Sequence, residues 1–271
     1  MNDLLGYKNQ KVVITGCASG MGAAAAQMLI DCGAEVYGLD VSDIDLAIHK
    51  ALRVDLSDKG SIDAAIAELP DEIYAVFNCA GVAHPPAPAD KTLLINFVGM
   101  RHLTEALLPR MSKGGGIASI ASTAGMAWQA NLEKIDECLA LADFDSAAAW
   151  VATEPTLGSA DPYGFSKQCM IVYSMRKAGE LAKQHIRINT IAPSPTETNF
   201  MVDLNSAGIS KDITQMFTPA SGEFAAGEDM GAALVMLNSK LGRFVSGVNL
   251  PVDYGYCAEV WMGQRDNLMG I

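Results

Sequence analysis

The fold is decided by the stretch KVVITGCASGMG, residues 11–22. An apolar run ends at Thr15, a glycine-rich turn follows at once, and an alanine-rich segment without proline continues from Gly22. This order predicts a buried strand, a tight turn and a helix. Glycines let such a turn approach a phosphate closely, and the helix start offers free N–H groups and the positive end of its dipole. The stretch therefore predicts a site for the pyrophosphate of a dinucleotide.

Short apolar runs and helical segments alternate along the rest of the chain. Such alternation predicts a parallel sheet with helices on both faces, the doubly wound α/β fold of the Rossmann type. No repeat, low-complexity tract or linker interrupts it, so residues 1–271 are expected to form a single domain. The predicted strands are residues 11–15, 35–39, 52–54, 73–77, 117–120, 186–191 and 245–250, and the predicted helices are residues 22–32, 61–69, 92–111, 163–184 and 228–237.

The composition excludes several classes of partner. Half of the residues are hydrophobic and 18% are charged, which suits a large core. A net charge of −12 would repel nucleic-acid phosphates and anionic membranes, so neither is expected as a partner. The chain has no apolar signal core and no stretch near the roughly 18 apolar residues of a membrane span, which predicts a cytoplasmic protein. Its six cysteines lack zinc-ligand spacing, so no metal is expected.

An acidic residue, Asp40, follows the second predicted strand. An acid at this place can accept hydrogen bonds from both ribose hydroxyls of an adenosine, and it would repel the additional phosphate of NADP. No arginine lies in the glycine turn or directly after Asp40. The alternative is that Asp40 only caps a turn. The position favours NAD as the cofactor.

Polar residues also follow the third and fourth predicted strands. Asp55 and Leu56 follow the third, and residues 78–81, Asn-Cys-Ala-Gly, follow the fourth. Ligands of such sheets bind at the carboxyl ends of the strands. Asp55 could therefore bond the amino group of an adenine, although its spacing fits a loop-capping role equally well.

Tyr163 and Lys167 begin a predicted helix, and their spacing of four places them on one face of it. A free tyrosine has a pKa of about 10 and is a poor base. A nearby ammonium group stabilises the phenolate and lowers that pKa. Tyr163 could then take a proton from an alcohol or give one to a carbonyl. By itself the pair also fits a surface tyrosine beside a solvated lysine.

These features, in this order, resemble the short-chain dehydrogenase/reductase family. The resemblance runs through nearly the whole chain, over the glycine turn 15–22, Asp55, residues 78–81, Asn96, residues 117–125, the Tyr163–Lys167 pair, residues 189–198 and residues 246–255. Departures fall in loops: Cys79 stands where a second asparagine is frequent, and Ser194 where glycine is usual. None of them removes a catalytic group.

The resemblance implies four catalytic residues. Tyr163 would be the proton donor and acceptor, and Lys167 would lower its pKa and hold the nicotinamide ribose. Ser122 would bond the substrate oxygen, with Ser119 as the alternative serine. Asn96 would hold a water molecule in a proton relay behind Lys167.

The resemblance also implies a set of NAD-binding residues. They come from the glycine turn, from the strand ends, from the catalytic helix and from a segment that orients the nicotinamide: Gly16, Ser19, Gly20, Met21, Asp40, Asp55, Leu56, Asn78, Ala80, Gly81, Tyr163, Lys167, Pro193, Thr196 and Thr198.

The segment between Ser122 and Tyr163 is much longer than in most of the family. Residues 127–160 are interpreted as an insertion with two short helices, at 131–142 and 146–152. This insertion resembles the subgroup of bacterial 3α-hydroxysteroid dehydrogenases/carbonyl reductases and coniferyl-alcohol dehydrogenases. It could cover an apolar pocket, occupy a face used for assembly, or only stabilise the fold.

The resemblance implies a substrate lid at residues 195–225. This segment contains Phe200, Met201, Met216 and Phe217, which would suit an apolar alcohol or ketone, although the same side chains could simply pack the segment onto the core. The favoured function is a 3α-hydroxysteroid (bile acid) dehydrogenase. The alternatives are an aromatic, coniferyl-type alcohol dehydrogenase and a regulator that binds NAD without turnover. A homodimer or homotetramer is expected.

Overall fold

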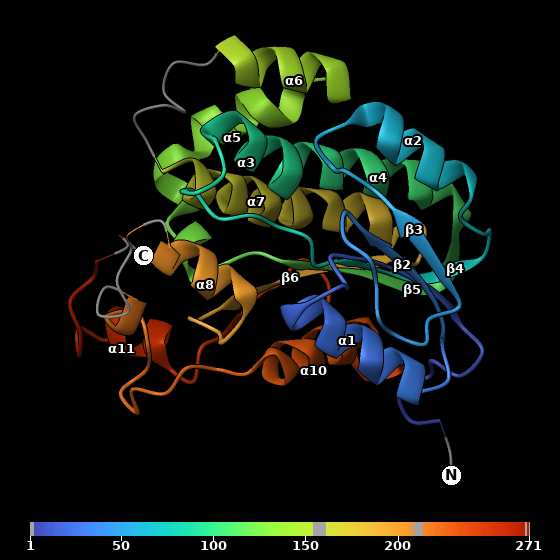
Figure 1. Cartoon of the computed structure of the whole chain (residues 1–271). Coiled ribbons are helices and arrows are strands. Elements are labelled where there is room, and N and C mark those ends of the chain that lie inside the picture. Colours follow the sequence, from blue (N-terminus) through green and yellow to red (C-terminus); the bar gives the residue numbers. More distant parts are fainter. Residues whose placement is uncertain (1–2, 154–160, 207, 209–213, 269, 271) are drawn as a thin grey trace.

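A seven-stranded parallel sheet forms the centre of the protein, in the strand order β3-β2-β1-β4-β5-β6-β7. The computed structural model describes residues 3–153, 161–206, 208, 214–268 and 270. Figure 1 shows α1 and α10 below the sheet and α2, α3, α4 and α7 above it. The doubly wound α/β fold of the Rossmann type is therefore confirmed. The strands are β1 Lys11–Thr15, β2 Glu35–Asp40, β3 Lys50–Arg53, β4 Ile73–Asn78, β5 Met111–Ile120, β6 Arg187–Pro193 and β7 Asn249–Val252.

Alternating side chains of the inner strands fill two cores, one on each face of the sheet. Val13 and Val76 belong to one core, whereas Ile14 and Phe77 belong to the other. Both faces are covered, so the inner strands are continuous apolar runs, without the alternation of a half-exposed strand. The covering helices are α1 Gly20–Asp31 and α10 Gly227–Asn238 below, and α2 Lys59–Ala67, α3 Ala89–Leu93, α4 Met100–Leu107 and α7 Pro162–Ala182 above.

The strand order reverses at β1, which lies between β2 and β4. In the register of the sheet, Thr15 at the end of β1 pairs with Leu39 on one side and with Asn78 on the other. The turns that follow these three strands therefore leave the sheet at one edge. Such a switch point opens a crevice at the carboxyl ends of the strands.

The long helix predicted at 92–111 is interrupted. A π-helical segment, Leu94–Gly99, separates α3 from α4, and a short 3₁₀ turn, Leu108–Arg110, leads into β5. π-Helical turns are rare and occur often at functional sites. Gly99 ends this one, and a Cβ atom there would lie 2.0 Å from the carbonyl oxygen of Leu56. The helix and the loop after β3 can therefore meet only at a glycine.

The last strand begins later than the sequence indicates. Residues 245–250 were expected, but β7 starts at Asn249. Gly247 has a φ of +78°, and Phe244 is 93% exposed. Phe244 and Val245 therefore lie on the surface, whereas Val248 packs against the core directly before the strand.

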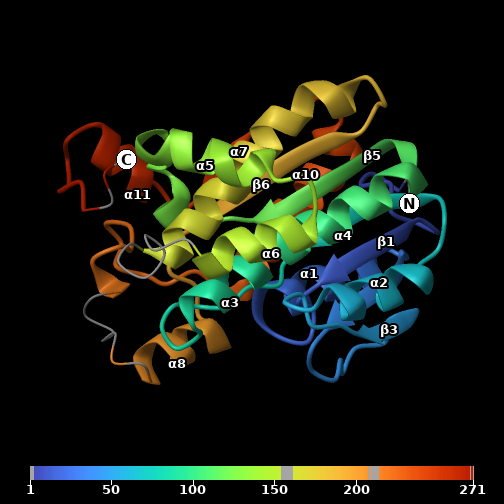
Figure 2. The same ribbon diagram turned by 90° about the horizontal axis from the view of Figure 1, so that it is seen from above.

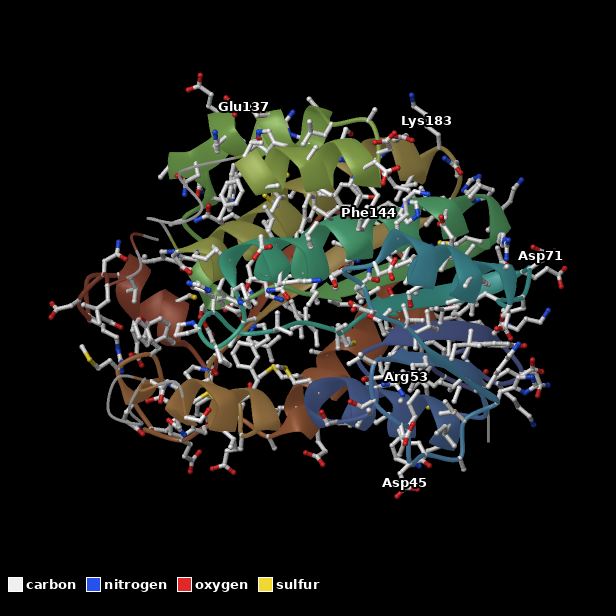
Figure 3. All side chains as sticks on the ribbon, turned by 45° about the horizontal axis from the view of Figure 1, so that its top comes forward. Asp45, Arg53, Asp71, Glu137, Phe144 and Lys183 are labelled. Carbon is white, nitrogen blue, oxygen red and sulfur yellow. The ribbon has the colours of Figure 1, made fainter. Side chains whose placement is uncertain are left out.

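Two short helices form in the insertion, as predicted: α5 Leu132–Ala140 and α6 Phe144–Thr153. Figures 1 and 2 show both on the side of α3, α4 and α7 that faces away from the sheet. Phe144, labelled in Figure 3, is buried there, and the Trp150 ring lies 6.4 Å from the ring of Phe165 on α7. The insertion thus extends the core outward over the helix that carries Tyr163.

Most charged side chains lie at the surface, with Lys167, Arg187 and Asp253 as buried exceptions among the described residues. Asp45, Asp71, Glu137 and Lys183 point outward from the surface in Figure 3. Within the described residues, no helix combines the length and the apolar character that crossing a membrane requires.

Candidate active site

A cavity of about 970 Å³ opens at the carboxyl edge of the sheet. This volume is at the upper end of the range for small-molecule sites, so a cofactor and a substrate can share it. Its lining includes Ser122, Tyr163 and Lys167. It also includes every predicted cofactor residue except Asn78, namely Gly16, Ser19, Gly20, Met21, Asp40, Asp55, Leu56, Ala80, Gly81, Tyr163, Lys167, Pro193, Thr196 and Thr198.

The glycine turn is packed so closely that two of its positions, Gly16 and Gly22, have no room for a side chain. Gly16 has a φ of +67°, and a Cβ atom on it would lie 2.5 Å from the backbone nitrogen of Ala80. A Cβ atom on Gly22 would lie 2.0 Å from the carbonyl oxygen of Gly16. The twelve-residue helix α1 starts here, and the side chain of its N-cap residue, Ser19, makes no capping hydrogen bond. The first N–H groups of α1 therefore fit the pyrophosphate of a dinucleotide.

Asp40 lies beside this turn and is held by backbone N–H groups. Its Oδ2 accepts a hydrogen bond from the nitrogen of Ala18 at 2.9 Å, and its Oδ1 accepts one from Ser42 at 2.9 Å. Each carboxylate oxygen keeps a lone pair. Asp40 therefore caps the turn and can also receive ribose hydroxyls.

Asp55 likewise combines a loop-capping role with a place in the cavity wall. Its Oδ1 accepts hydrogen bonds from the nitrogen and the Oγ of Ser57, at 2.8 and 2.7 Å. Burial pushes the pKa of Asp55 upward, but the Ser57 hydrogen bonds and the charge of Lys91 hold it below its usual value. The carboxylate therefore stays ionised, as an acceptor for an adenine amino group must be.

The side chain of Asn78 lies outside the cavity lining. Its side chain is buried, and its Nδ2 donates to the Oγ1 of Thr104 and the Oγ of Ser119, both at 3.1 Å. The amide ties β4 to β5 and α4, so its position does not support the expected contact with the cofactor. The same hydrogen bond holds Ser119, which is 1% exposed and outside the cavity lining. Of these two serines, Ser122 lines the cavity and Ser119 does not.

Tyr163 and Ser122 meet in the cavity from two different elements. Asp161 caps α7 by accepting a hydrogen bond from Gly164 at 2.9 Å, and Pro162 occupies the first helical position. Both features fix the start of a helix, so Tyr163 is presented in its first turn. Ser122 follows β5, and its hydroxyl shares a hydrogen bond with the Tyr163 phenol.

The pKa values of the catalytic pair are set mainly by burial. Burial raises the pKa of Tyr163 to about 12, the Ser122 hydrogen bond opposes this rise, and the charge of Asp161 adds to it. Burial lowers the pKa of Lys167 to about 8. The Nζ of Lys167 donates to the carbonyl oxygen of Ile120 at 2.7 Å. The expected lowering of the Tyr163 pKa by Lys167 is therefore not seen, and the phenol carries its proton at neutral pH.

Asn96 lies behind Lys167, inside the π-helical segment. Its Oδ1 accepts from the nitrogen of Val82 at 2.8 Å, and its Nδ2 donates to the Val82 carbonyl oxygen at 3.0 Å. A Cβ atom on Gly81 would lie 3.3 Å from the Oδ1 of Asn96 and 3.4 Å from the Nζ of Lys167. The two side chains therefore flank Gly81, although Asn96 does not line the cavity itself.

The substrate side of the cavity is apolar. Phe200 packs against the catalytic tyrosine, with ring centres 5.5 Å apart, and Met201 and Phe217 line the wall as predicted. Met216 is 50% exposed and outside the lining, and residues 207 and 209–213 of the predicted lid lie outside the described residues. Leu268 from the C-terminal tail lines the cavity as well.

Two further lining residues, His84 and Lys91, carry no motif that could have revealed them. Within the described residues there is no cluster of three or more His, Cys, Asp or Glu side chains that could hold a metal ion.

Known proteins are similar in sequence to this chain over most of its length. Residues 10–133 match the short chain dehydrogenase family, and residues 147–257 match the family described as enoyl-(acyl carrier protein) reductase. Coniferyl-alcohol dehydrogenase of Pseudomonas sp. (strain HR199 / DSM 7063) is 33% identical over 254 residues, which cover 91% of this chain and 96% of that protein. The 3-alpha-hydroxysteroid dehydrogenase/carbonyl reductase of Comamonas testosteroni is 27% identical over 247 residues, which cover 90% and 95%.

A solved structure is also similar. The 3-alpha-hydroxysteroid dehydrogenase from Pseudomonas sp. B-0831, complexed with NADH, superposes with a TM-score of 0.76 at 25% identity, over 95% of this chain and 100% of that one. Identity of 33% along nine-tenths of the chain goes beyond a shared fold. The protein belongs to the short-chain dehydrogenase/reductase family, and it is an oxidoreductase that acts on alcohols with a nicotinamide cofactor.

Proposed function

We propose that the protein oxidises an aromatic alcohol of the coniferyl type with NAD. The observation that carries this proposal is the contact of Phe200 with Tyr163, at 5.5 Å between ring centres, in an apolar wall. A planar ring that packs on Phe200 gains the aromatic contact and brings an alcohol on its side chain toward Tyr163. Greater identity to the coniferyl-alcohol dehydrogenase, 33% against 27% for the steroid enzyme, supports the same choice.

The charge of Asp40 supports NAD over NADP. A phosphate on the adenosine ribose would lie beside this carboxylate and be repelled by it. Two backbone N–H groups fix the carboxylate, so it does not swing away. Lys91, an exposed lysine of the described lining, donates a hydrogen bond to Ser57 and makes none to Asp40.

The side chains in the cavity divide the acid–base work. When bound, the nicotinamide ring supplies the redox chemistry by accepting or returning a hydride. Ser122 would donate a hydrogen bond to the alcohol oxygen and stabilise the negative charge that develops on it, beside the phenol of Tyr163. Tyr163 removes the hydroxyl proton in oxidation and returns a proton to the carbonyl oxygen in reduction. The Lys167 ammonium, held by its hydrogen bond to the carbonyl oxygen of Ile120, lies beside the phenol and would hold the ribose of the nicotinamide.

A 3α-hydroxysteroid is the second candidate substrate. The NADH complex with a TM-score of 0.76 is a 3-alpha-hydroxysteroid dehydrogenase. Met201, Phe217 and Leu268 add an apolar wall that a rigid polycyclic alcohol could also fill.

A substrate panel separates the candidates. NAD reduction is followed with coniferyl alcohol, cinnamyl alcohol and matched 3α- and 3β-hydroxysteroids. The proposal predicts the highest kcat/KM for the two aromatic alcohols. Turnover of the 3α-hydroxysteroid alone would establish the second candidate. Absence of turnover across the panel, with NADH bound normally, would instead favour a regulator that only senses the dinucleotide.

A further inference from the structure

One exposed cation lies in the cavity without a role in the proposed chemistry. Lys91 extends from α3, and its side chain lines the cavity together with Asp55, Leu56 and Ser57. Its Nζ donates a hydrogen bond to the Oγ of Ser57 at 2.8 Å. The lysine therefore spans the adenosine end of the cavity, from α3 to the loop that follows β3.

This contact begins a chain of hydrogen bonds that ends on a carboxylate. The Ser57 Oγ accepts the hydrogen bond of Lys91 and donates one to the Oδ1 of Asp55 at 2.7 Å. The nitrogen of Asp55 donates to the Oγ of Ser61 on α2 at 3.0 Å. The direction of the chain fixes the Ser57 hydroxyl and leaves the second carboxylate oxygen of Asp55 for a ligand.

A close backbone contact at the end of the π-helical segment that follows α3 helps to position Lys91. Gly99 touches the carbonyl oxygen of Leu56, where a Cβ atom would lie 2.0 Å away. The segment from α3 to α4 is thus held against the loop after β3 at two points, by Gly99 and by Lys91. The second point is a single hydrogen bond between partly exposed side chains, so it can open and close.

Lys91 also matters because it is an accessible positive charge at the cavity of an acidic protein. The described lining residues include two lysines, Lys91 and Lys167, and no arginine. Lys167 is 3% exposed and already bonded to Ile120, whereas Lys91 is exposed and makes no recorded ion pair within the described part of the chain. The protein has a net charge of −12, and a dinucleotide is itself an anion. Lys91 therefore supplies the accessible positive charge at a site that must attract an anion.

We propose that Lys91 is a cofactor-binding residue, which draws the anionic dinucleotide into the cavity and closes over its adenosine end through the hydrogen bond to Ser57. The proposal rests on the nicotinamide cofactor and does not depend on which alcohol is oxidised.

Lys91→Met tests it, because methionine keeps an apolar stem and removes the charge. NADH is titrated by its fluorescence at low and high ionic strength, and AMP and NMN are measured as competitors. We expect the Kd values of NADH and AMP to rise about 3- to 10-fold at low salt, as the loss of one charge-assisted hydrogen bond would cause. The difference should shrink at high salt, which screens the exposed charge. The Kd of NMN, which lacks the adenosine, should not change.

Lys59→Met is the matched control. Lys59 is a lysine of α2 that pairs with Asp63 at 2.8 Å and does not line the cavity. It changes the net charge equally, so NADH affinity should stay at the wild-type value. An unchanged NADH affinity in Lys91→Met, or an equal loss for NMN, would overturn the proposal. If NADPH, titrated in the same way, were the only ligand to bind more weakly, the proposal would also be overturned, because Lys91 would then bind the additional phosphate. No alcohol enters these measurements, so they remain valid if the proposed substrate is wrong.

Discussion

The Nζ of Lys167 lies 5.6 Å from the ring centre of Tyr163 and donates its hydrogen bond to the carbonyl oxygen of Ile120. The end of β5 thereby holds the ammonium group that the catalytic helix presents. Ser122, two residues further along the chain from Ile120, bonds the phenol itself. The end of β5 thus positions both the acid–base residue and its charged neighbour.

The rate of oxidation should rise with pH. Burial raises the pKa of Tyr163 to about 12, so the phenolate that takes the alcohol proton is a minor form at neutral pH and becomes more abundant as the pH increases. Reduction uses the protonated phenol and should not gain from alkaline pH. The measurement is kcat/KM in both directions between about pH 6 and pH 10. An oxidation rate that falls over this range would contradict the assignment.

Lys167→Met should inactivate the enzyme and stabilise the fold at neutral pH. The folded-state pKa of Lys167, about 8, is below its ordinary value of 10.5, so the unfolded chain binds more protons between these values. Stability from this group is therefore lowest below about pH 8 and rises with pH up to about 10.5.

Removing the buried charge should stabilise the fold, and losing the hydrogen bond to Ile120 should offset part of this gain. The net increase in the free energy of unfolding at pH 7 should be about 1–2 kcal/mol. This gain should shrink as the pH rises. Denaturant unfolding at several pH values measures it. Lys183→Met, an exposed residue at the end of α7, serves as the control. A gain that grows with pH would refute the buried-ammonium argument.

Ser122→Ala should lower kcat by about 10²- to 10³-fold, the usual effect of losing one donor at a developing oxyanion. Ser119→Ala is the informative comparison, because Ser119 is buried outside the cavity and bonds Asn78. It should alter stability more than kcat. A large loss of kcat in Ser119→Ala with normal folding would mean that the wrong serine has been assigned.

Asp40→Asn should shift cofactor preference toward NADP. Replacing the carboxylate removes the charge that repels an additional phosphate, and the ratio of kcat/KM for NADP to that for NAD should increase on the order of tenfold or more. Asp45→Asn, on the outward-facing loop after β2, should leave the ratio unchanged. Equal preference in the wild-type protein would show that Asp40 does not discriminate.

The sequence predicts those parts of the site in which chemistry demands fixed residue types at fixed spacing. Gly16 and Gly22 are recognisable because no other residue fits a backbone contact of 2.0–2.5 Å. Tyr163 and Lys167 are recognisable because helical spacing brings them together. The parallel sheet follows from the alternation of buried strands with helices, because each strand end leads to the same edge.

Other features depend on contacts between residues far apart in the chain. Asn78 stands at a strand end, but Thr104 and Ser119 draw its amide into the core. Lys91 carries no motif, and only the crossing of α3 over the loop after β3 brings it to Ser57. The π-helical segment is likewise invisible in an apolar pattern that fits an uninterrupted helix.

Turnover and cofactor binding of Tyr163→Phe test the central claim most directly. Phenylalanine keeps the ring against Phe200 and removes only the hydroxyl. We expect kcat to fall by about 10²- to 10⁴-fold, the usual contribution of a general acid–base group, while the Kd of NADH stays close to the wild-type value. Wild-type turnover in this variant, or a loss of activity explained entirely by lost NADH binding, would contradict the assignment of Tyr163 as the proton-transfer residue.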